Sequence, residues 1–411
     1  MKRINIDSTR LWHTIMEMAK IGATPKGGVK RLALTETDKA ARDLFCFWAE
    51  SDGFDCECDS VGNIYVTLRG TSKDMFPVLI GSHLDTQPTG GKFDGIYGVM
   101  AGYEVIRTIK EQGIKTSRPI TVVNWTNEEG VRFAPAMAGS GVFSGVYTEE
   151  EIYNSKDNKG MTFEGELKKI GYMGNKKPID YKAGIYIEPH IEQGPILESG
   201  NYKIGIVKGV QGQLSLDVSV TGFESHSGST PMNMRKDALL SSSRMCLALN
   251  RIATEQFPGS VATVGRMIVQ PGARNTVPGK TFFTVDIRHP RKEILFEMEA
   301  KIKQHFQNIA DETVTKVEIK KAWFTPPVVF DNICVETLRK SAEFLGYNFK
   351  EMVSGAGHDA CMVNNKVPGC MIFVPCEKGI SHNELEKAVP EDLAAGANVL
   401  LYSVMDFAEK K

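Results

Sequence analysis

The sequence predicts an α/β fold in which a large α/β domain is interrupted by a smaller inserted α+β domain. Two apolar runs, PVLIGSH at 77–83 and ITVVNWT at 120–126, end in polar residues and flank a helical pattern, as buried strands of an open sheet do. The segment 213–221 instead alternates apolar and polar residues, which is typical of a half-buried strand. A buried-type run, MIFVP at 371–375, returns near the end of the chain. This change of pattern and its return predict an insertion.

The elements of the first section follow one another in the order expected of an open α/β sheet. Hydrophobic periodicity predicts helices over 8–20 and 37–52, strands over 53–59 and 63–68, and a helix over 96–112 between the two buried strands. A glycine-rich turn, with Gly91 and Gly95 among its residues, opens that last helix. Open α/β sheets place their sites at the carboxyl ends of such strands.

The middle section predicts a self-contained module. Its elements are expected as strand 213–221, helix 236–254, strand 261–269, strand 280–288, helix 291–309 and strand 313–321. The order βαββαβ is that of a ferredoxin-like α+β domain. We therefore predict a discontinuous α/β domain formed by residues 1–209 and 326–411, with the inserted domain at 210–325.

Composition and charge exclude several classes of protein. The 411 residues are 42% hydrophobic and 24% charged, which is ordinary for a folded chain. Lys and Arg number 49 against 50 Asp and Glu, so no global basic field is available to hold nucleic acid or an anionic membrane. No apolar run approaches the length of a membrane span, and the start MKRINIDSTR lacks the apolar core of a signal peptide. The sequence predicts a cytoplasmic protein without nucleic-acid or membrane partners.

The eight cysteines are spread along the chain without a C-x-x-C pair. Neither a disulfide framework nor a zinc ribbon is indicated, and reduced, buried thiols are expected. Cys56 and Cys58 lie two apart in a predicted strand, so both should point to one face.

Histidines and acids occur together at predicted strand ends and in loops. His83 ends a buried strand, Glu128 and Glu129 follow the next strand, and Asp94, His190 and His382 lie in polar, glycine-bounded segments. Each of these residues has an ordinary structural alternative, a hydrogen-bonded histidine, a turn aspartate or a solvated glutamate pair. Their combination at one expected sheet edge favours a site.

Imidazole with carboxylate is the ligand set of Zn, Mn, Co or Ni rather than of Ca or Mg. An aspartate can bridge two such ions, which then share a water and lower its pKa. Of the adjacent glutamates, one can bind metal while the other acts as general base and then as acid to a leaving nitrogen. Asp85 lies two residues from His83 and would fix the tautomer of that imidazole without binding the metal itself.

Nine segments together carry a resemblance to a known family. They occur in the order GSHLDT, GGKFDG, NEEGVRFAPAMAGS, HIEQGP, SHSGSTPM, PGARNTVPG, TVDIRH, SGAGHDA and MIFVPCEKGISHNELE. The chain resembles the M20-like metal-dependent amidohydrolases, in the branch of N-carbamoyl-L-amino acid hydrolase, β-ureidopropionase and allantoate amidohydrolase. The resemblance implies a zinc-peptidase-like catalytic domain with a central mixed sheet, interrupted by a lid that also forms a homodimer.

The resemblance also assigns roles to single residues. One of two divalent ions would take His83, Asp94 and His190, and the other Asp94, Glu129 and His382, with Glu128 as the catalytic base. His226 would stabilise the oxyanion, in the site of the partner subunit. The expected substrate contacts are Gln193, Asn275, Arg288 and Gly357, with Arg288 pairing with a substrate carboxylate. Arg235, Arg266 and Arg274 are alternative anchors for that carboxylate.

The implied reaction is metal-dependent hydrolysis of the carbamoyl C–N bond of N-carbamoyl-L-amino acids or N-carbamoyl-β-alanine, giving the amino acid, CO₂ and ammonia. A metal-bridging hydroxide would be the nucleophile. Allantoate amidohydrolase and an M20-type aminoacylase or dipeptidase stay open as alternatives, and a metal- or amino-acid-binding protein is the alternative outside enzymes. SGAGHDA also fits G-x-G-x-x-A, but no βαβ unit begins there, so a dinucleotide site is not indicated.

Overall fold

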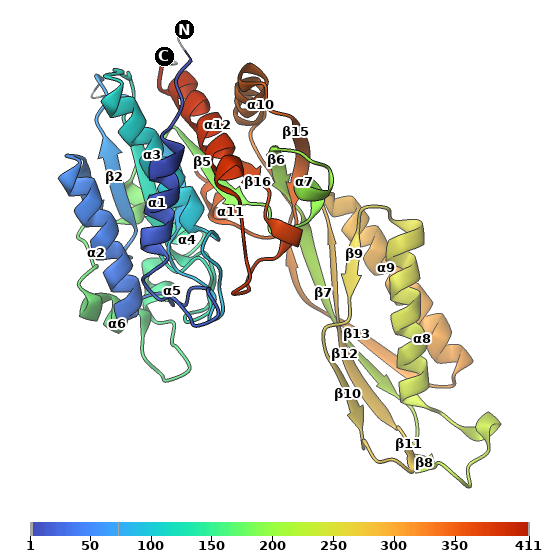
Figure 1. The fold of residues 1–411 in the computed structure, drawn as a ribbon. Helices are drawn as coiled ribbons and strands as arrows, with labels where there is room; N and C mark the ends of the chain where they lie inside the picture. Colours follow the sequence, from blue (N-terminus) through green and yellow to red (C-terminus); the bar gives the residue numbers. More distant parts are fainter. Residues whose placement is uncertain (1–2, 73, 410–411) are drawn as a thin grey trace. The chain divides into compact units, whose positions relative to one another are not determined.

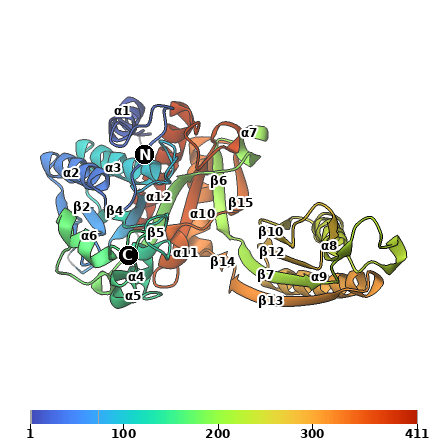
Figure 2. The same cartoon turned by 90° about the horizontal axis from the view of Figure 1, so that it is seen from below.

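The computed structural model describes residues 3–72 and 74–409, in which the chain forms two compact units. The first unit consists of the residues up to Lys208 and those from Val329 onward, and the second unit is Gly209–Val328. Each unit has its own sheet, as Figures 1 and 2 show. None of the helices in the described residues is long and apolar enough to cross a membrane.

The first unit contains a mixed sheet of nine strands. Their order is β1-β2-β4-β3-β5-β16-β6-β14, with β15 paired to β6. The central strands β4, β3, β5 and β16 are parallel, whereas β2 and β6 join them antiparallel. The strands are β1 (Asp55–Cys58), β2 (Ile64–Leu68), β3 (Val78–His83), β4 (Ile120–Trp125), β5 (Ile185–Ile191), β6 (Ile204–Val210), β14 (Val328–Val329), β15 (Phe349–Ser354) and β16 (Gly369–Val374). The predicted α/β fold with a central mixed sheet is confirmed.

The central strands are buried along their whole length because helices cover the sheet. All residues of β3, β4, β5 and β16 are buried, as their continuous apolar runs predict. The helices α1 (Ser8–Met18), α3 (Ile96–Glu111) and α12 (Pro390–Glu409) pack against one another, and α3 and α12 also contact the sheet (Figure 1). The shorter helices α4 (Ala138–Ser144) and α11 (Asp359–Val363) contact each other and the strands β4 and β5. The remaining α-helices of this unit are α2 (Glu36–Ser51), α5 (Glu149–Tyr153), α6 (Phe163–Ile170), α7 (Ile196–Ser199) and α10 (Asn332–Leu345).

The second unit is an antiparallel sheet packed against two helices. Its strand order is β10-β12-β7-β13, with β9 on the same edge of β12 as β10. The strands are β7 (Gly212–Thr221), β9 (Val261–Thr263), β10 (Met267–Gln270), β12 (Lys280–His289) and β13 (Lys316–Thr325), the helices are α8 (Ala238–Arg251) and α9 (Lys292–Glu312), and β8 (Ser225–His226) pairs with β11 (Thr276–Val277). Leu214, Leu216, Val218 and Val220 of β7 lie in one apolar core with residues of both helices, which explains the alternation of this strand.

Two predicted strands of the second unit were wrong in their extent. The run 261–269 is not one strand, because the chain leaves the β12 ladder around Gly265 and divides into β9 and β10. The strand expected at 313–321 begins only at Lys316 and continues to Thr325. Thr313 caps α9 and Val314 has a positive φ of 53°, so the chain turns there before the strand begins.

A buried ion pair anchors α2 in the first unit. The carboxylate of Asp38 accepts hydrogen bonds from the backbone N–H of Leu34 and from Arg42 Nε, each at 2.8 Å, and both charged side chains are at most 1% exposed. The guanidinium also donates to the carbonyl oxygen of Gly62 at 2.6 Å. On the same helix Lys39 and Asp43 form a pair with the same spacing, but both side chains are exposed.

Replacing Arg42 should therefore destabilise the protein far more than replacing Lys39. Arg42→Met leaves the Asp38 carboxylate buried without its counter-ion, which should cost about 3–5 kcal/mol in the free energy of unfolding. Lys39→Met removes an exposed pair with the same spacing and should change that free energy by no more than about 0.5 kcal/mol. Urea unfolding of both variants measures the difference, and equal losses would contradict this account.

Candidate metal centre

The site is built at the carboxyl ends of the parallel strands. His83 is the last residue of β3, and Glu128 and Glu129 follow β4. His190 lies near the end of β5. Because β4, β3 and β5 are parallel neighbours, their carboxyl ends meet at one edge of the sheet. Asp94 reaches the same place from the turn that precedes α3.

The first group of potential ligands is buried and held in place. His83 Nε2 lies 3.8 Å and His190 Nε2 lies 3.2 Å from Asp94 Oδ1. The other ring nitrogen of each histidine faces a backbone carbonyl oxygen at 2.9 Å, that of Asp85 for His83 and that of Ile191 for His190. These bonds leave Nε2 of both rings directed at Asp94, as a metal ligand requires.

The second group shares Asp94 with the first. His382 Nε2 lies 3.3 Å from Asp94 Oδ2 and 3.6 Å from Glu129 Oε2. The two carboxylate oxygens of Asp94 therefore face different sets of side chains. The side chain of His382 is 52% exposed, whereas those of Asp94 and Glu129 are almost fully buried. In each group the potential ligand atoms lie within 4.8 Å of one another, so either group could hold a metal ion.

Residues from the end of the first unit hold Asp94 in position. Glu386 Oε1 accepts the backbone N–H groups of Phe93 at 2.9 Å and Asp94 at 3.1 Å. The hydroxyl of Ser381 lies within hydrogen-bonding distance of both Asp94 Oδ2 and Glu386 Oε2. Gly95 follows with a positive φ of 68°, and a Cβ at this position would lie 2.3 Å from the His83 ring. Only glycine lets the turn approach the histidine so closely.

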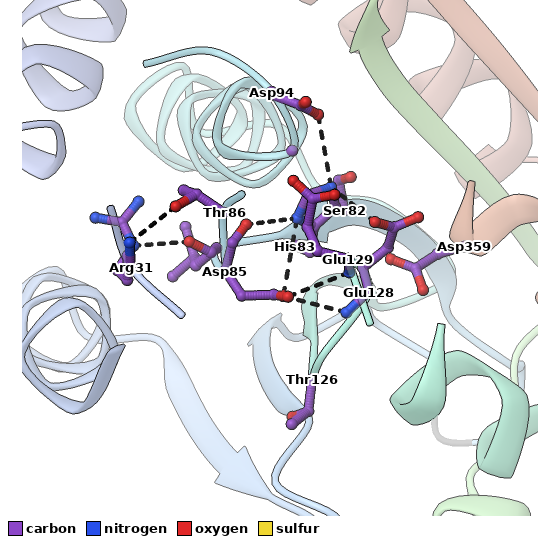
Figure 3. Close-up of polar contacts among 12 residues, drawn as sticks. Arg31, Ser82, His83, Asp85, Thr86, Asp94, Thr126, Glu128, Glu129 and Asp359 are labelled. Atoms are coloured by element: carbon purple, nitrogen blue, oxygen red, sulfur yellow. Dashed lines mark hydrogen bonds and ion pairs between the residues drawn. The ribbon is translucent and has the colours of Figure 1, made fainter. Parts of the chain in front are cut away.

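Glu128 lies next to the first group without belonging to it. Its Oε2 is 3.5 Å from His83 Nε2, and Figure 3 shows its side chain beside those of Glu129 and Asp359. Helix α4 secures the backbone here, because the N–H of Met137 donates to the carbonyl oxygen of Glu128 at 2.7 Å. A carboxylate that faces a potential ligand but lies outside both potential ligand groups can accept and donate protons.

Asp85, which was predicted to fix the tautomer of His83, contacts that imidazole through its backbone. Its carbonyl oxygen lies 2.9 Å from Nδ1 of His83, whereas its carboxylate lies 3.8 Å from that nitrogen. The carboxylate oxygens instead accept the backbone N–H groups of Glu128 and Glu129, each at 3.2 Å (Figure 3). Strand β3 ends at His83, and the side chain of Asp85 beyond it points to the neighbouring loop and positions both glutamates.

The site gathers several carboxyl groups away from water. Burial raises the pKa of Glu128 well above its ordinary value, and neighbouring carboxyl groups, first that of Asp359, add to the rise. Burial raises the pKa of Glu129 to about 8, with the carboxylate of Asp94 contributing. The pKa of Asp94 itself is held well below its usual range, because hydrogen bonds from His190 and His382 outweigh its burial.

The donor atoms fit a divalent cation. Among the described residues, Glu129 Oε1 is buried and has no hydrogen-bond partner, and the same holds for Gln193 Oε1. A buried carboxylate oxygen without a partner is costly, and a cation at this point would satisfy it. Two imidazole nitrogens and a carboxylate in one group, and one imidazole with two carboxylates in the other, suit Zn, Mn, Co or Ni.

Comparison with known proteins agrees with the resemblance seen in the sequence. The sequence profile of peptidase family M20/M25/M40 matches residues 79–406. The chain belongs to this family.

Relatives within the family match over the whole chain. An N-carbamoyl-L-amino-acid amidohydrolase of Rhizobium meliloti is 48% identical over 408 residues, covering 99% of this chain and 98% of the relative. An allantoate amidohydrolase of Escherichia coli is 34% identical and covers 97% of both chains. A solved structure of an amidase of the hydantoinase/carbamoylase family from Burkholderia multivorans has a TM-score of 0.96 and 49% identity, covering 99% of both chains.

Three predicted site residues of this M20 chain belong to the second unit. The imidazole of His226 is exposed in β8, and its Nδ1 accepts the N–H groups of Gly228 and Ser229. Asn275 lies beside β8, since its carbonyl oxygen accepts the N–H of Ser227. Arg288 lies near the far end of β12, where its Nε donates to Asp286 Oδ1 at 2.9 Å. At about 3.4 Å per residue, most of β12 separates Arg288 from the other two by about 25 Å.

The two remaining predicted contacts belong to the first unit. Gln193 has a positive φ, and its Nε2 donates to Asp94 Oδ2 at 2.9 Å. It therefore contacts the potential ligand that the two groups share. Gly357 lies in the loop between β15 and α11, and a Cβ there would come no closer than 3.6 Å to Met137. A Cβ at this position would therefore be in ordinary contact with Met137, and no side chain lies closer.

Several residues around the site were missed by sequence reasoning. Glu188 is fully buried and accepts hydrogen bonds from the hydroxyl of Ser82 and the backbone N–H of Ala360, both at 2.7 Å. Glu386 was not singled out either, although it holds the Asp94 turn. Both acids stand at regular spacings from predicted ligands, two residues before His190 and four residues after His382. The signal that could have found these two acids was a charged residue within an apolar segment or within a segment that carries a predicted ligand.

Removing the Asp85 carboxylate should weaken metal binding. Asp85→Ala leaves the N–H groups of Glu128 and Glu129 without their acceptor, so the loop that carries a ligand becomes less ordered. Loss of such a supporting group typically lowers metal affinity about 10–100-fold. Titration of metal-free protein with zinc measures the change, and the exposed Asp43→Ala serves as control. An unchanged affinity in Asp85→Ala would show that the carboxylate does not support the centre.

Proposed function

We propose that the protein is a metal-dependent hydrolase that cleaves the carbamoyl C–N bond of N-carbamoyl-L-amino acids or of N-carbamoyl-β-alanine. The products are the amino acid, CO₂ and ammonia. The observation that carries the chemistry is the position of Glu128, which faces His83 yet lies outside both potential ligand groups. The names of the relatives support the substrate class, because the Rhizobium protein with 48% identity is an N-carbamoyl-L-amino-acid amidohydrolase.

Two divalent ions would be held by residues already in place. His83, His190 and Asp94 Oδ1 would bind one ion, and His382, Glu129 and Asp94 Oδ2 the other. Such ions supply Lewis acidity to the substrate carbonyl and make water a better nucleophile at neutral pH. The ring nitrogens facing backbone carbonyls keep both buried histidines in the tautomer that this ligation needs.

Glu128 would move the proton. Its burial and the neighbouring carboxyl groups raise its pKa, so the side chain can take up a proton at Oε2 and keep it. The proton is then available for the nitrogen that leaves the carbamoyl carbon. The carboxylate of Asp85 holds the backbone on which this transfer depends.

We also propose that the second unit is a ferredoxin-like lid that forms the homodimer, with the α/β domain at 1–209 and 326–411 carrying catalysis. Arg288, Asn275, Gln193 and Gly357 would bind the substrate, and His226 would stabilise the oxyanion.

His226 and Asn275 lie at the opposite end of β12 from Arg288, so one chain cannot bring all three to one small molecule. This separation supports the idea that His226 acts in the site of a partner subunit. A cytoplasmic location remains a prediction of the sequence alone.

Allantoate amidohydrolysis is the second candidate. It is supported by the Escherichia coli relative of that name, with 34% identity over nearly the whole chain. The same ligand groups and the same base would serve this reaction, since allantoate also carries ureido groups and a carboxylate. The two candidates differ in the substrate and not in the chemistry.

An assay of metal-stripped and reloaded protein tests the proposed function. Ammonia release is measured from N-carbamoyl-L-methionine, N-carbamoyl-β-alanine and allantoate, before and after reloading with Zn, Mn, Co or Ni. Turnover of a carbamoyl substrate should vanish on chelation and return with at least one of the metals. Faster turnover of allantoate would favour the second candidate, and full activity of metal-free protein would overturn the metal-dependent mechanism.

Replacing the two adjacent glutamates separately should distinguish base from ligand. Glu128→Gln should keep its metal content but lose about 10²–10⁴-fold in kcat, the usual contribution of a general acid-base group. Glu129→Gln should instead lower the metal content of the protein, because it removes a charged ligand of the second group. Elemental analysis and steady-state kinetics of both variants measure this. Loss of metal in Glu128→Gln would reassign that residue as a ligand.

A further inference from the structure

Three cysteines gather where α2 packs against β1, away from the candidate metal centre. Cys46 lies on α2, and Cys56 and Cys58 lie on β1. The Sγ atoms of Cys46 and Cys56 are 3.2 Å apart. The thiol of Cys58 instead donates to the carbonyl oxygen of Tyr172 at 2.9 Å. Of the two thiols on β1, only Cys56 is therefore in contact with Cys46.

The surroundings make the two sulfurs chemically different. Cys46 Sγ accepts a hydrogen bond from the Cys56 thiol and lies 4.0 Å from the hydroxyl of Tyr172. The guanidinium of Arg42, one helical turn earlier, adds positive charge, and Glu50 opposes it. The Cys56 thiol and these other groups together lower the pKa of Cys46, whereas the contact with Cys46 and burial raise that of Cys56. Because the hydroxyl of Tyr172 and the guanidinium of Arg42 both lie on the side of Cys46, we expect Cys46 to be the nucleophile of the pair.

Access separates this pair from a second pair of thiols in contact, Cys334 and Cys370. Cys46 and Cys56 are partly exposed, whereas Cys334 and Cys370, which also contact each other, are buried. The two potential ligand groups found in the described part of the chain contain no cysteine. The pair is therefore open to a small oxidant and is not part of a metal site.

We propose that Cys46 and Cys56 form a peroxide-sensitive dithiol that closes to a reversible disulfide between α2 and β1. The Cys46 thiolate attacks one oxygen of hydrogen peroxide, an S–O bond forms, the O–O bond breaks, and hydroxide leaves and takes up a proton as water. Cys56 then attacks the sulfur of the resulting sulfenic acid, an S–S bond forms, the S–O bond breaks, and a second water leaves. The two thiols lose two electrons and peroxide gains them. A thiol reductant reverses the change.

The geometry requires little movement for this closure. The two sulfurs need to approach by roughly 1 Å to reach the length of a disulfide bond. The link would tie α2 to β1 and restrain the helix that carries the buried Arg42. Oxidised protein should therefore resist unfolding better than reduced protein.

Peptide mapping of the full-length, zinc-loaded protein after treatment with hydrogen peroxide tests the proposal. Cleavage after Glu50 and Glu57 places Cys46, Cys56 and Cys58 on three separate peptides. The expected product is a 46–56 linked pair of peptides, about 2 Da lighter than the sum of the two, which dithiothreitol separates again. The wild-type map needs no variant, so it stands even if a substitution prevents folding.

Variants identify the roles of the two thiols. Cys56→Ser should accumulate sulfenic acid at Cys46, trapped by dimedone, and Cys46→Ser should form neither the sulfenic acid nor the link. Cys58→Ser is the matched control on the same strand and should still form the link. A 46–58 link, oxidation of Cys334 and Cys370 at the same rate, or thiols at 46 and 56 that stay fully alkylatable would each overturn the proposal.

Discussion

The carboxylate of Asp94 lies between two sets of side chains, and the arrangement of the site depends on it. One of its oxygens faces the buried imidazoles of His83 and His190, and the other faces His382. The turn that carries Asp94 is held by Glu386, which comes from the far end of the chain. The segment that carries Glu386 lies beyond the second unit in sequence, so both pieces of the first unit must fold together before the site exists.

The same arrangement places several carboxyl groups out of contact with water. Burial and mutual repulsion raise the pKa values of Glu128 and Glu129, whereas the neighbouring imidazoles hold the pKa of Asp94 low despite its burial. Without a cation, ionising these buried carboxyl groups is costly. Metal ions at the two potential ligand groups would favour the ionised forms, so stability and metal binding should be linked.

The second unit carries its predicted site residues at two distant places. His226 and Asn275 lie together at β8 and β11, and Arg288 lies at the other end of β12. A rigid antiparallel strand separates them, because β12 is paired with β7 along its entire length. Asn275 and Arg288 are thirteen residues apart in the sequence, and this spacing therefore corresponds to a distance along β12. The two side chains do not lie in one pocket.

The sequence by itself determined the α/β class, the central strands, the interruption of the pattern and the ligand-type residues. These are local properties: a strand buried on both faces must be apolar, as β3 and β4 are, and the glycine turn before α3 is required by the close approach to His83. The tertiary structure alone decided which atoms meet. The carbonyl oxygen of Asp85 rather than its carboxylate holds His83. Glu386 supports Asp94 although nearly three hundred residues separate them in the sequence. Of the two cysteines on β1, Cys56 and not Cys58 contacts Cys46. Such contacts depend on how helices and strands distant in sequence pack, and no local pattern of residues encodes that packing.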